Sequence, residues 1–381
     1  MKTAKKEEKK VEYLELIYDL VFVYVIGRNN SLLHQSENGF VEGKVFLAYI
    51  LCTLTVVQIW NFSTYYINMH GRNGLRDHIC LFINMFLLYF IGEGTRTHWD
   101  AHLLEYHIAW GLILINLGLQ YFIELRNCRE RPEVYAQTKR MGFVLAAEAL
   151  MVFITYPVYK ATGITAAPFA LLFGIVGTMI HGKKAKVILV DFPHLTERAM
   201  LYVVITFGEM MVALAGYFEG SLTVDSMYFS LMCFLIVVGL FLSYGTVYDH
   251  LIDREMENSG ILYMFLHIFI IFALSIITTS LEFMRNSEVD LLPKIVMLIS
   301  AFLTYYIFLF MTLRYSKRRC RPDTRFVMSL AGCAVSFAVL MLIFKENSAA
   351  NIAISAVYVW GIFLILHRFS KITSEEQSQT H

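Results

Sequence analysis

Charged residues are scarce in this sequence. Asp, Glu, Lys and Arg make up 17% of its 381 residues, whereas soluble domains carry about 25%. The formal net charge is only +1, which excludes the strongly basic balance expected of a nucleic-acid-binding protein. Hydrophobic residues account for 57% of the chain, more apolar surface than a soluble core of this length would bury. We therefore predict an all-α polytopic membrane protein that contacts membrane lipids and binds no nucleic acid.

The sequence also lacks the motifs that mark common catalytic sites. It contains no phosphate-binding glycine loop, no nucleophile elbow and no HExxH metalloprotease motif. Its six cysteines include no CxxC pair, so free thiols are expected and no disulfide framework. We accordingly predict that the protein is not an enzyme and has no cofactor.

One histidine-rich segment has spacing compatible with metal binding. His98, Asp100, His102, Glu105 and His107 cluster before an apolar run, and the two histidines four residues apart would share a helix face. No other residues complete the ligand set, so a solvated outer loop is the favoured interpretation and no metal site is predicted.

Apolar runs of membrane-spanning length recur along the chain. They predict about twelve transmembrane helices, over residues 12–33, 44–69, 76–95, 103–125, 139–160, 165–182, 195–217, 227–250, 261–283, 292–314, 324–344 and 350–369. With the N-terminus in the cytoplasm, 24 of the 32 Lys and Arg residues fall in cytoplasmic segments and 6 in outer loops. This asymmetry predicts a multi-pass inner-membrane protein with both termini in the cytoplasm.

The two halves of the chain share landmarks at a nearly constant offset. Glu15 and Glu197 begin the first and seventh predicted helices, and Thr64 and Thr246 lie at the same separation. We predict two parallel six-helix repeats, residues 12–190 and 191–371, flanked by cytoplasmic tails 1–11 and 372–381. Six is an even number, so the repeats would be related by an axis along the membrane normal, with any pathway near their interface.

Four motifs resemble the bacterial low-temperature-requirement A (LtrA) family. They are ELIYDLVFV at residues 15–23, the Trp60, Thr64 and Asn68 pattern, HLTERAMLYVVITFGE at residues 194–209, and VYDH at residues 247–250 followed by Tyr263 and His267. Their order covers nearly the whole chain. The resemblance implies a polytopic inner-membrane protein linked to growth in the cold, and it implies no particular substrate or reaction.

Ionisable residues at membrane depth are costly and usually face a bundle interior or a wet cavity. The predicted ion- or substrate-binding residues are therefore Glu15, Asp19, Arg28, Glu148, Glu197, Glu209, Asp249 and His267. Glu15 and Asp19 are four residues apart and share one helix face, where two carboxylates repel each other or attract a cation. Arg28 would point to the opposite face, with Glu209 as the expected partner and Glu148 as the other candidate.

Structural roles remain open for several of these groups. Glu15 and Glu197 are also explained as acidic residues that a helix N-terminus favours, and Arg198 is expected to extend to the cytoplasmic surface. The asparagines Asn84 and Asn116 would join helices, and a buried pair at Glu148 or Glu209 would serve packing alone. His267 would act in a proton relay or as a hydrogen-bonded packing residue.

These features favour a transporter or channel for a small ion or solute, with buried carboxylates and an arginine near the repeat interface. The alternative is a non-transporting membrane sensor or stress-response factor, in which the buried charges specify packing. An intramembrane enzyme ranks last, because no catalytic constellation is recognised. The sequence leaves the identity of the solute and the oligomeric state open, a homodimer included.

Overall fold

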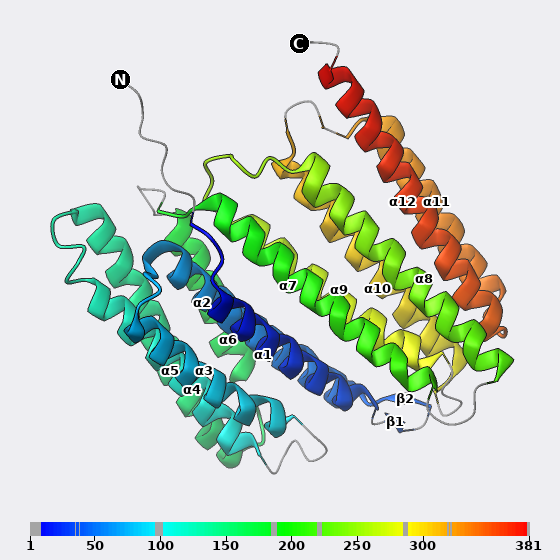
Figure 1. The fold of residues 1–381 in the computed structure, drawn as a ribbon. Helices are drawn as coiled ribbons and strands as arrows, with labels where there is room; N and C mark the ends of the chain where they lie inside the picture. Colours follow the sequence, from blue (N-terminus) through cyan, green and yellow to red (C-terminus); the bar gives the residue numbers. More distant parts are fainter. Residues whose placement is uncertain are drawn as a thin grey trace. The chain divides into compact units, whose positions relative to one another are not determined.

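The computed structural model describes residues 9–34, 36–37, 39–95, 102–183, 189–218, 223–284, 289–317, 320 and 322–378. These residues are nearly all helical, as predicted (Figure 1). The α-helices are α1 (Tyr13–Asn30), α2 (Gly43–His70), α3 (Leu75–Gly94), α4 (Leu103–Glu124), α5 (Pro132–Thr162), α6 (Ala167–Lys183), α7 (Phe192–Ala213), α8 (Val224–Thr246), α9 (Ile261–Phe283), α10 (Leu291–Met311), α11 (Thr324–Ile343) and α12 (Ser348–Ser378). Short elements are the 3₁₀ turns η1 (Ser31–His34), η3 (Leu214–Phe218) and η5 (Thr312–Tyr315), the π-helical turn η4 (Val247–Leu251), and the strands β1 (Ser36–Glu37) and β2 (Phe40–Val41).

Ten of the helices in the described part of the chain are long and apolar enough to cross a membrane. The protein is therefore multi-pass, in agreement with the prediction. Two α-helices fall outside that set for different reasons: α1 carries Glu15, Asp19 and Arg28, and α6 has only 17 residues. The predicted count of twelve spans remains a prediction.

Local sequence signals set several helix ends. Thr223 and Ser226 form a reciprocal capping box at the start of α8, and Asp323 accepts a hydrogen bond from the Phe326 amide at the start of α11. Helix α5 is followed by Gly163, which has φ of +72°, a left-handed conformation that glycine adopts without a Cβ clash. These caps satisfy main-chain groups that the ends of a helix leave unpaired.

The chain divides into two compact units. Unit 1 consists of residues 1–35, 43–202 and 255–264, and unit 2 consists of residues 36–42, 203–254 and 265–381. Helix α7 contributes its first half to unit 1 and its second half to unit 2. The predicted six-helix repeats, with their boundary at residue 190, stay a prediction.

In unit 1, α4 packs closely against both α3 and α5 (Figure 1). Glycine permits the close approach of α4 and α5, because a Cβ added at Gly111 would lie 2.6 Å from the Phe153 ring. The core contains the fully buried indoles of Trp60 and Trp110. Helix α1 packs against α2 and α3, and its Glu15 and Asp19 are buried.

In unit 2, α8 packs against α12, and α11 pairs with α12 (Figure 1). Trp360 of α12 donates a hydrogen bond to the Leu235 carbonyl of α8 at 3.0 Å. The rings of Phe337 and Tyr358 stack with centroids 4.1 Å apart and join α11 to α12. The hairpin of β1 and β2 belongs to this unit, where the Gly39 carbonyl accepts a hydrogen bond from the Asp290 amide.

Candidate functional site

A buried arginine lies at the centre of the charged groups of unit 1. Arg198, in the second turn of α7, is 0% exposed. Its Nε and Nη2 donate to the two carboxylate oxygens of Asp19 at 3.2 and 2.5 Å, and its Nη1 donates to Glu15 Oε2 at 2.5 Å. The bidentate arrangement with Asp19 is the strong geometry for a guanidinium and a carboxylate. Arg198 thereby holds the start of α7 against α1.

This arrangement corrects the expectation that Arg198 extends to the membrane surface. Its position early in α7 places it within reach of the helix end, but the side chain points into the protein toward α1. A guanidinium removed from water needs a fully paired environment, and the two carboxylates four residues apart on α1 supply it. The repulsion expected between Glu15 and Asp19 is thus offset by a cation from another helix.

His194 extends the cluster, one helical turn before Arg198. Its Nε2 lies 3.5 Å from Glu15 Oε2, and its Nδ1 lies 3.0 Å from Asn68 Nδ2. The main chain of Asp191 determines the orientation of the Asn68 amide, because its N–H donates to Asn68 Oδ1 and its carbonyl accepts from Asn68 Nδ2. Asn68 therefore donates to His194 Nδ1, and the neutral imidazole carries its proton on Nε2, toward Glu15.

Trp60 completes the surroundings of Asp19. Its indole Nε1 donates to Asp19 Oδ1 at 2.8 Å, and its ring packs on Tyr202 with centroids 4.4 Å apart. The cluster holds two carboxylates and one guanidinium. Every charged member has a partner of opposite sign, so the geometry is that of a closed ion-pair network in which α1, α2 and α7 meet.

The second buried carboxylate site of unit 1 is different. Glu148, midway along α5, is 0% exposed, and no group in the described part of the chain forms an ion pair with it or hydrogen-bonds either of its oxygens by the usual geometric criteria. Gln58 of α2 lies beside it, close enough for its amide to favour the carboxylate electrostatically, and its Nε2 donates to the Leu171 carbonyl at 3.1 Å. Both side chains occupy the space beside Gly174 of α6, where an added Cβ would overlap them. The glycine therefore makes room for the carboxylate.

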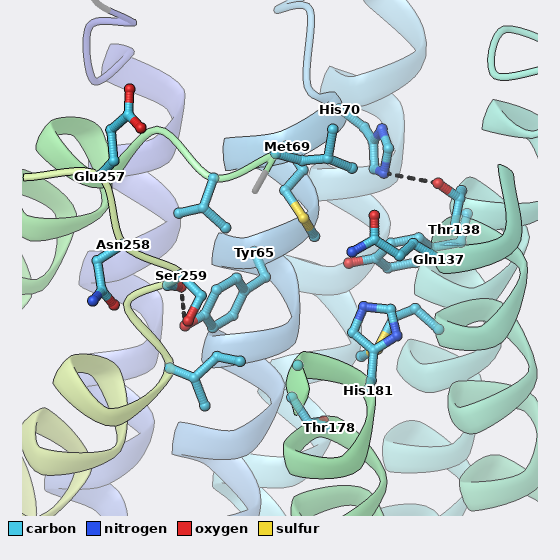
Figure 2. A pocket seen from close by; sticks show the side chains of 16 residues that line it. Tyr65, Met69, His70, Gln137, Thr138, Thr178, His181, Glu257, Asn258 and Ser259 are labelled. Carbon is cyan, nitrogen blue, oxygen red and sulfur yellow. Dashed lines mark hydrogen bonds between the residues drawn. The ribbon is translucent and has the colours of Figure 1, made fainter. Parts of the chain in front are cut away.

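A cavity of about 320 Å³ lies in the same unit (Figure 2). Its walls come from α2, α4, α5, α6, the segment before α7 and the segment that leads into α9. The lining residues are Tyr65, Met69, His70, Tyr121, Gln137, Thr138, Met141, Thr178, His181, Gly182, Leu189, Val190, Glu257, Asn258, Ser259 and Ile261. Hydroxyl, amide and imidazole groups alternate with thioether and aliphatic groups on these walls. Such a lining suits a small ligand with both polar and apolar parts.

The cavity and Glu148 share the same faces of three helices. Met141, which lines the cavity, lies seven residues before Glu148 on α5. The two neighbours of Glu148 show the same separation from the cavity: Tyr65 lies seven residues after Gln58 on α2, and His181 lies seven residues after Gly174 on α6. Seven residues are two helical turns, so the offset keeps the face and spans about 10 Å along each helix. The cavity therefore lies two turns from the buried carboxylate, on the same side of each of the three helices.

A second cavity, of about 480 Å³, reaches Glu15 beside the start of α1. Lys9 lines it and donates hydrogen bonds from its Nζ to the carbonyl oxygens of Ile67 and Gly71 at the end of α2. Burial lowers the pKa of the Lys9 ammonium, and the nearby carboxylates of Glu15 and Asp77 partly oppose this. Lys9 thus caps the end of α2 and adds a positive charge near the ion-pair network.

Arg28 has a different partner from the one expected. Its guanidinium donates to Glu93 Oε1 of α3 at 3.1 Å and to the Tyr24 hydroxyl at 3.0 Å, with about a third of the side chain exposed. This pairing joins α1 to α3 within unit 1. Glu197, one residue before Arg198, is half-buried and takes no part in the network. Neither residue belongs to the buried carboxylate sites.

The remaining predicted residues belong to unit 2. Glu209 is half-buried, and its carboxylate is close enough to that of Glu282 for the two charges to repel. Asp249 is exposed in the π-helical turn η4. His267 is buried, with its Nε2 3.0 Å from the Tyr244 hydroxyl, which suits a packing role as well as a relay. These three residues do not form a cluster comparable to the one around Arg198.

The asparagines that we expected to join helices do so in unit 1. Asn116 of α4 donates to Asn84 Oδ1 of α3 at 2.8 Å, and Asn84 in turn donates to the Tyr18 hydroxyl of α1 at 3.2 Å. The predicted loop residues His98 and Asp100 lie outside the described residues. Within the described ranges, no group of three His, Cys, Asp or Glu side chains is placed to hold a metal ion. All six cysteines are among the described residues, and none of them is in a disulfide bond.

Sequence reasoning missed several members of these sites. Arg198 was assigned to the surface, and His194, Gln58 and Tyr121 were not proposed as site residues at all. For the first two a signal existed: His194 and Arg198 are four residues apart, as are Glu15 and Asp19, so two charged faces of equal length were available to pair. Nothing in the sequence marked Gln58, an ordinary polar residue in an apolar run.

A family model described as "Bacterial low temperature requirement A protein (LtrA)" matches residues 10–362. The match covers most of the chain and includes both buried carboxylate sites. The chain belongs to the LtrA family. The predicted membership is therefore confirmed, and with it a multi-pass membrane protein of a bacterial family. No curated protein and no solved structure matches the chain.

Proposed function

We propose that this LtrA family protein is a transporter or channel for a small ion or solute, and that Glu148 is the group that binds a cation or exchanges protons. The observation that supports the proposal is the position of Glu148, fully buried and two turns from a cavity on the same faces of α2, α5 and α6. Burying an ionisable group in a membrane bundle without an ion-pair partner among the described residues costs free energy, so such a group usually has a function.

The proposal changes the expected roles of the other charged residues. Glu15, Asp19 and Arg198 saturate one another, so we assign them to holding α7 on α1 rather than to binding the transported species. Breaking that network during each transport cycle would leave a charge buried without a partner, which costs on the order of 3–5 kcal/mol. Glu148 has no such network to break.

Ion flux in proteoliposomes tests the proposal directly. Wild-type protein should conduct or exchange under an imposed proton, sodium or potassium gradient, and Glu148→Gln should lower the flux at least about tenfold by removing the ionisable group at constant size. Glu133→Gln, which changes an exposed carboxylate of the same helix, serves as the matched control and should keep wild-type flux. Equal flux in wild type and Glu148→Gln would remove Glu148 from the path.

A glycine variant provides an independent check. Gly174→Ala should displace the Glu148 carboxylate and lower the flux, because the added methyl would overlap both Glu148 and Gln58. Gly361→Ala, at a helical glycine with nothing within 4 Å of the added Cβ, is the control. Absence of wild-type flux under all gradients would instead favour the non-transporting sensor or stress-response factor.

We also propose that all twelve α-helices cross the membrane, in two six-helix repeats with both termini in the cytoplasm. Helix α1 has 18 residues, about 27 Å of rise, and the pairing with Arg198 removes much of the cost of its two carboxylates. The distribution of Lys and Arg supports the cytoplasmic termini. In oriented vesicles, Lys10→Cys and Lys371→Cys should react with an impermeant maleimide only from the cytoplasmic side. Labelling of the two from opposite sides would require an odd number of spans.

A further inference from the structure

The cavity of unit 1 has walls of restricted chemistry. No Lys or Arg lines it, and Glu257, the only carboxylate among its lining residues, is exposed. Figure 2 shows Glu257 at the edge of the group, with His181 and Gln137 facing each other on the other side. A charged ligand would find no buried counter-charge here, and a buried charge without one is strongly disfavoured.

Two polar atoms of the lining are buried and have no hydrogen-bond partner among the described residues. Tyr121 of α4 is 1% exposed, and its hydroxyl is buried without a partner. The Nδ1 atom of His181 on α6 is in the same condition. Buried polar atoms are nearly always hydrogen-bonded, so two such atoms on the wall of one cavity indicate a ligand that supplies the missing bonds.

Aromatic rings and methionine thioethers form part of the wall. The rings of His70 and Tyr121 meet edge to face with centroids 5.7 Å apart, and Met69 and Met141 contribute thioethers. Aromatic faces and thioethers both favour contact with an aromatic ring of the ligand. The polar atoms and these surfaces line the same space, which favours a planar molecule with hydrogen-bonding groups on its edge.

The segment that leads into α9, residues 257–261, closes one side of the cavity. The Tyr65 hydroxyl donates to the Ser259 carbonyl at 3.3 Å. The Ile261 side chain occupies the space where a Cβ at Gly182 would be, so the glycine permits α6 to contact Ile261. Figure 2 shows Tyr65 turned toward Ser259. The cavity is therefore bounded by residues 257–261 on one side and by the polar faces of α5 and α6 on the other.

We propose that this cavity binds a small, uncharged, planar solute that carries hydrogen-bonding groups on an aromatic or heteroaromatic ring. The inference names the substrate class for the proposed transport and rests on that function for its physiological role. Tyr121 and His181 bind the polar edge of the solute, and the methionines and aromatic rings bind its faces. Exclusion of ions follows from the absence of a buried counter-charge on the walls.

Three probes of nearly the same shape separate charge from fit. Nicotinamide is uncharged, nicotinate is an anion, and 1-methylnicotinamide is a cation. Saturation-transfer NMR titrations on the full-length protein in detergent micelles, corrected against micelles alone, give the three dissociation constants. Nicotinamide should bind at least about tenfold more tightly than either ion, because each ion would lose its hydration without gaining a counter-charge.

Variants of the wall locate the binding. Tyr121→Phe, which removes only the hydroxyl, should weaken nicotinamide binding about fivefold, as expected for the loss of one hydrogen bond. Tyr89→Phe, at a tyrosine that is 53% exposed on α3, is the matched control and should bind like wild type. Thr178→Leu, which fills part of the cavity, is the second variant and should also weaken binding.

The outcomes are distinct from those of the flux experiment. Equal binding of the three probes, binding of none of them, or wild-type affinity in both Tyr121→Phe and Thr178→Leu would overturn the inference. Selective nicotinamide binding without any solute or ion flux would uphold the cavity's ligand class and defeat the transporter proposal. Ion flux that depends on Glu148, without nicotinamide binding, would do the reverse.

Discussion

Two buried carboxylate sites in unit 1 have opposite environments. Asp19 accepts hydrogen bonds from Arg198 and Trp60, whereas no group in the described part of the chain hydrogen-bonds or ion-pairs with Glu148 by the same criteria. Both residues are 0% exposed, so burial alone does not distinguish them. The difference is in compensation: Arg198 forms an ion pair at the first site, whereas at the second the carboxylate fills the space beside a glycine.

This contrast separates two uses of charge inside a membrane. A saturated pair has a single stable arrangement and joins helices, because any displacement leaves a charge without a partner. A carboxyl without an ion pair takes up and releases a proton or cation without breaking one. Deep acidic residues are therefore not equivalent site candidates, and the presence or absence of a cationic neighbour distinguishes them.

The largest effect should come from removing the cation of the saturated site. Arg198→Met would leave Glu15 and Asp19 buried together without a counter-charge, and we expect a loss of about 3–5 kcal/mol in the free energy of unfolding. Unfolding titrations with SDS in mixed micelles would measure it. Arg126→Met, at an exposed arginine that follows α4, is the control and should differ from wild type by less than about 0.5 kcal/mol. A stability for Arg198→Met near that of the control would mean that the pairing contributes little.

An intermediate effect should appear when Asp19 and Glu148 are replaced, in separate variants, by the corresponding amides. Asp19→Asn leaves the bidentate guanidinium short of charge, and we expect a loss of about 2–4 kcal/mol in the free energy of unfolding. Glu148→Gln should change the same quantity by less than about 1 kcal/mol, because no pairing is lost. The same SDS titration measures both variants. Equal losses at the two positions would abolish the distinction between the sites.

The smallest effect concerns Lys9, next to the saturated site. Burial lowers the pKa of its ammonium in the folded protein, so the unfolded chain binds more protons between the folded and unfolded pKa values. The contribution of Lys9 to stability should therefore rise as the pH increases through that window toward the ordinary value of 10.5. Lys9→Met should remove this part of the pH dependence, measured by unfolding at a series of alkaline pH values. A parallel dependence in wild type and variant would assign it to other groups.

Hydropathy was sufficient to predict the nearly all-helical, multi-pass architecture, because it is a property of the one-dimensional sequence. The pairing of Arg198 was not predicted, because its closeness to the start of α7 is equally compatible with extending to the surface. Which neighbour a helix face meets depends on packing, and α1 happens to present two carboxylates to α7. Motif spacing contained part of that information, since His194 and Arg198 repeat the spacing of Glu15 and Asp19.

The site at Glu148 was only half predictable. The carboxylate was evident from its apolar surroundings in α5, but its neighbours Gln58 and Gly174 lie 90 residues before it and 26 residues after it in the sequence. No local pattern connects them, because their association results from the packing of α2, α5 and α6. The prediction that Arg28 pairs with Glu209 was wrong for the same reason, because packing places Glu93 of α3 next to α1.

The common seven-residue offset on α2, α5 and α6 limits how the chain can vary in length. Inserting or deleting one residue between Met141 and Glu148 would turn the carboxylate by about 100° and shift it by about 1.5 Å relative to Gln58. Each helix therefore tolerates length changes only outside this stretch, in the connecting loops. In descendants of this sequence, gaps should accumulate in those loops, and the three stretches should remain constant in length even where their side chains change.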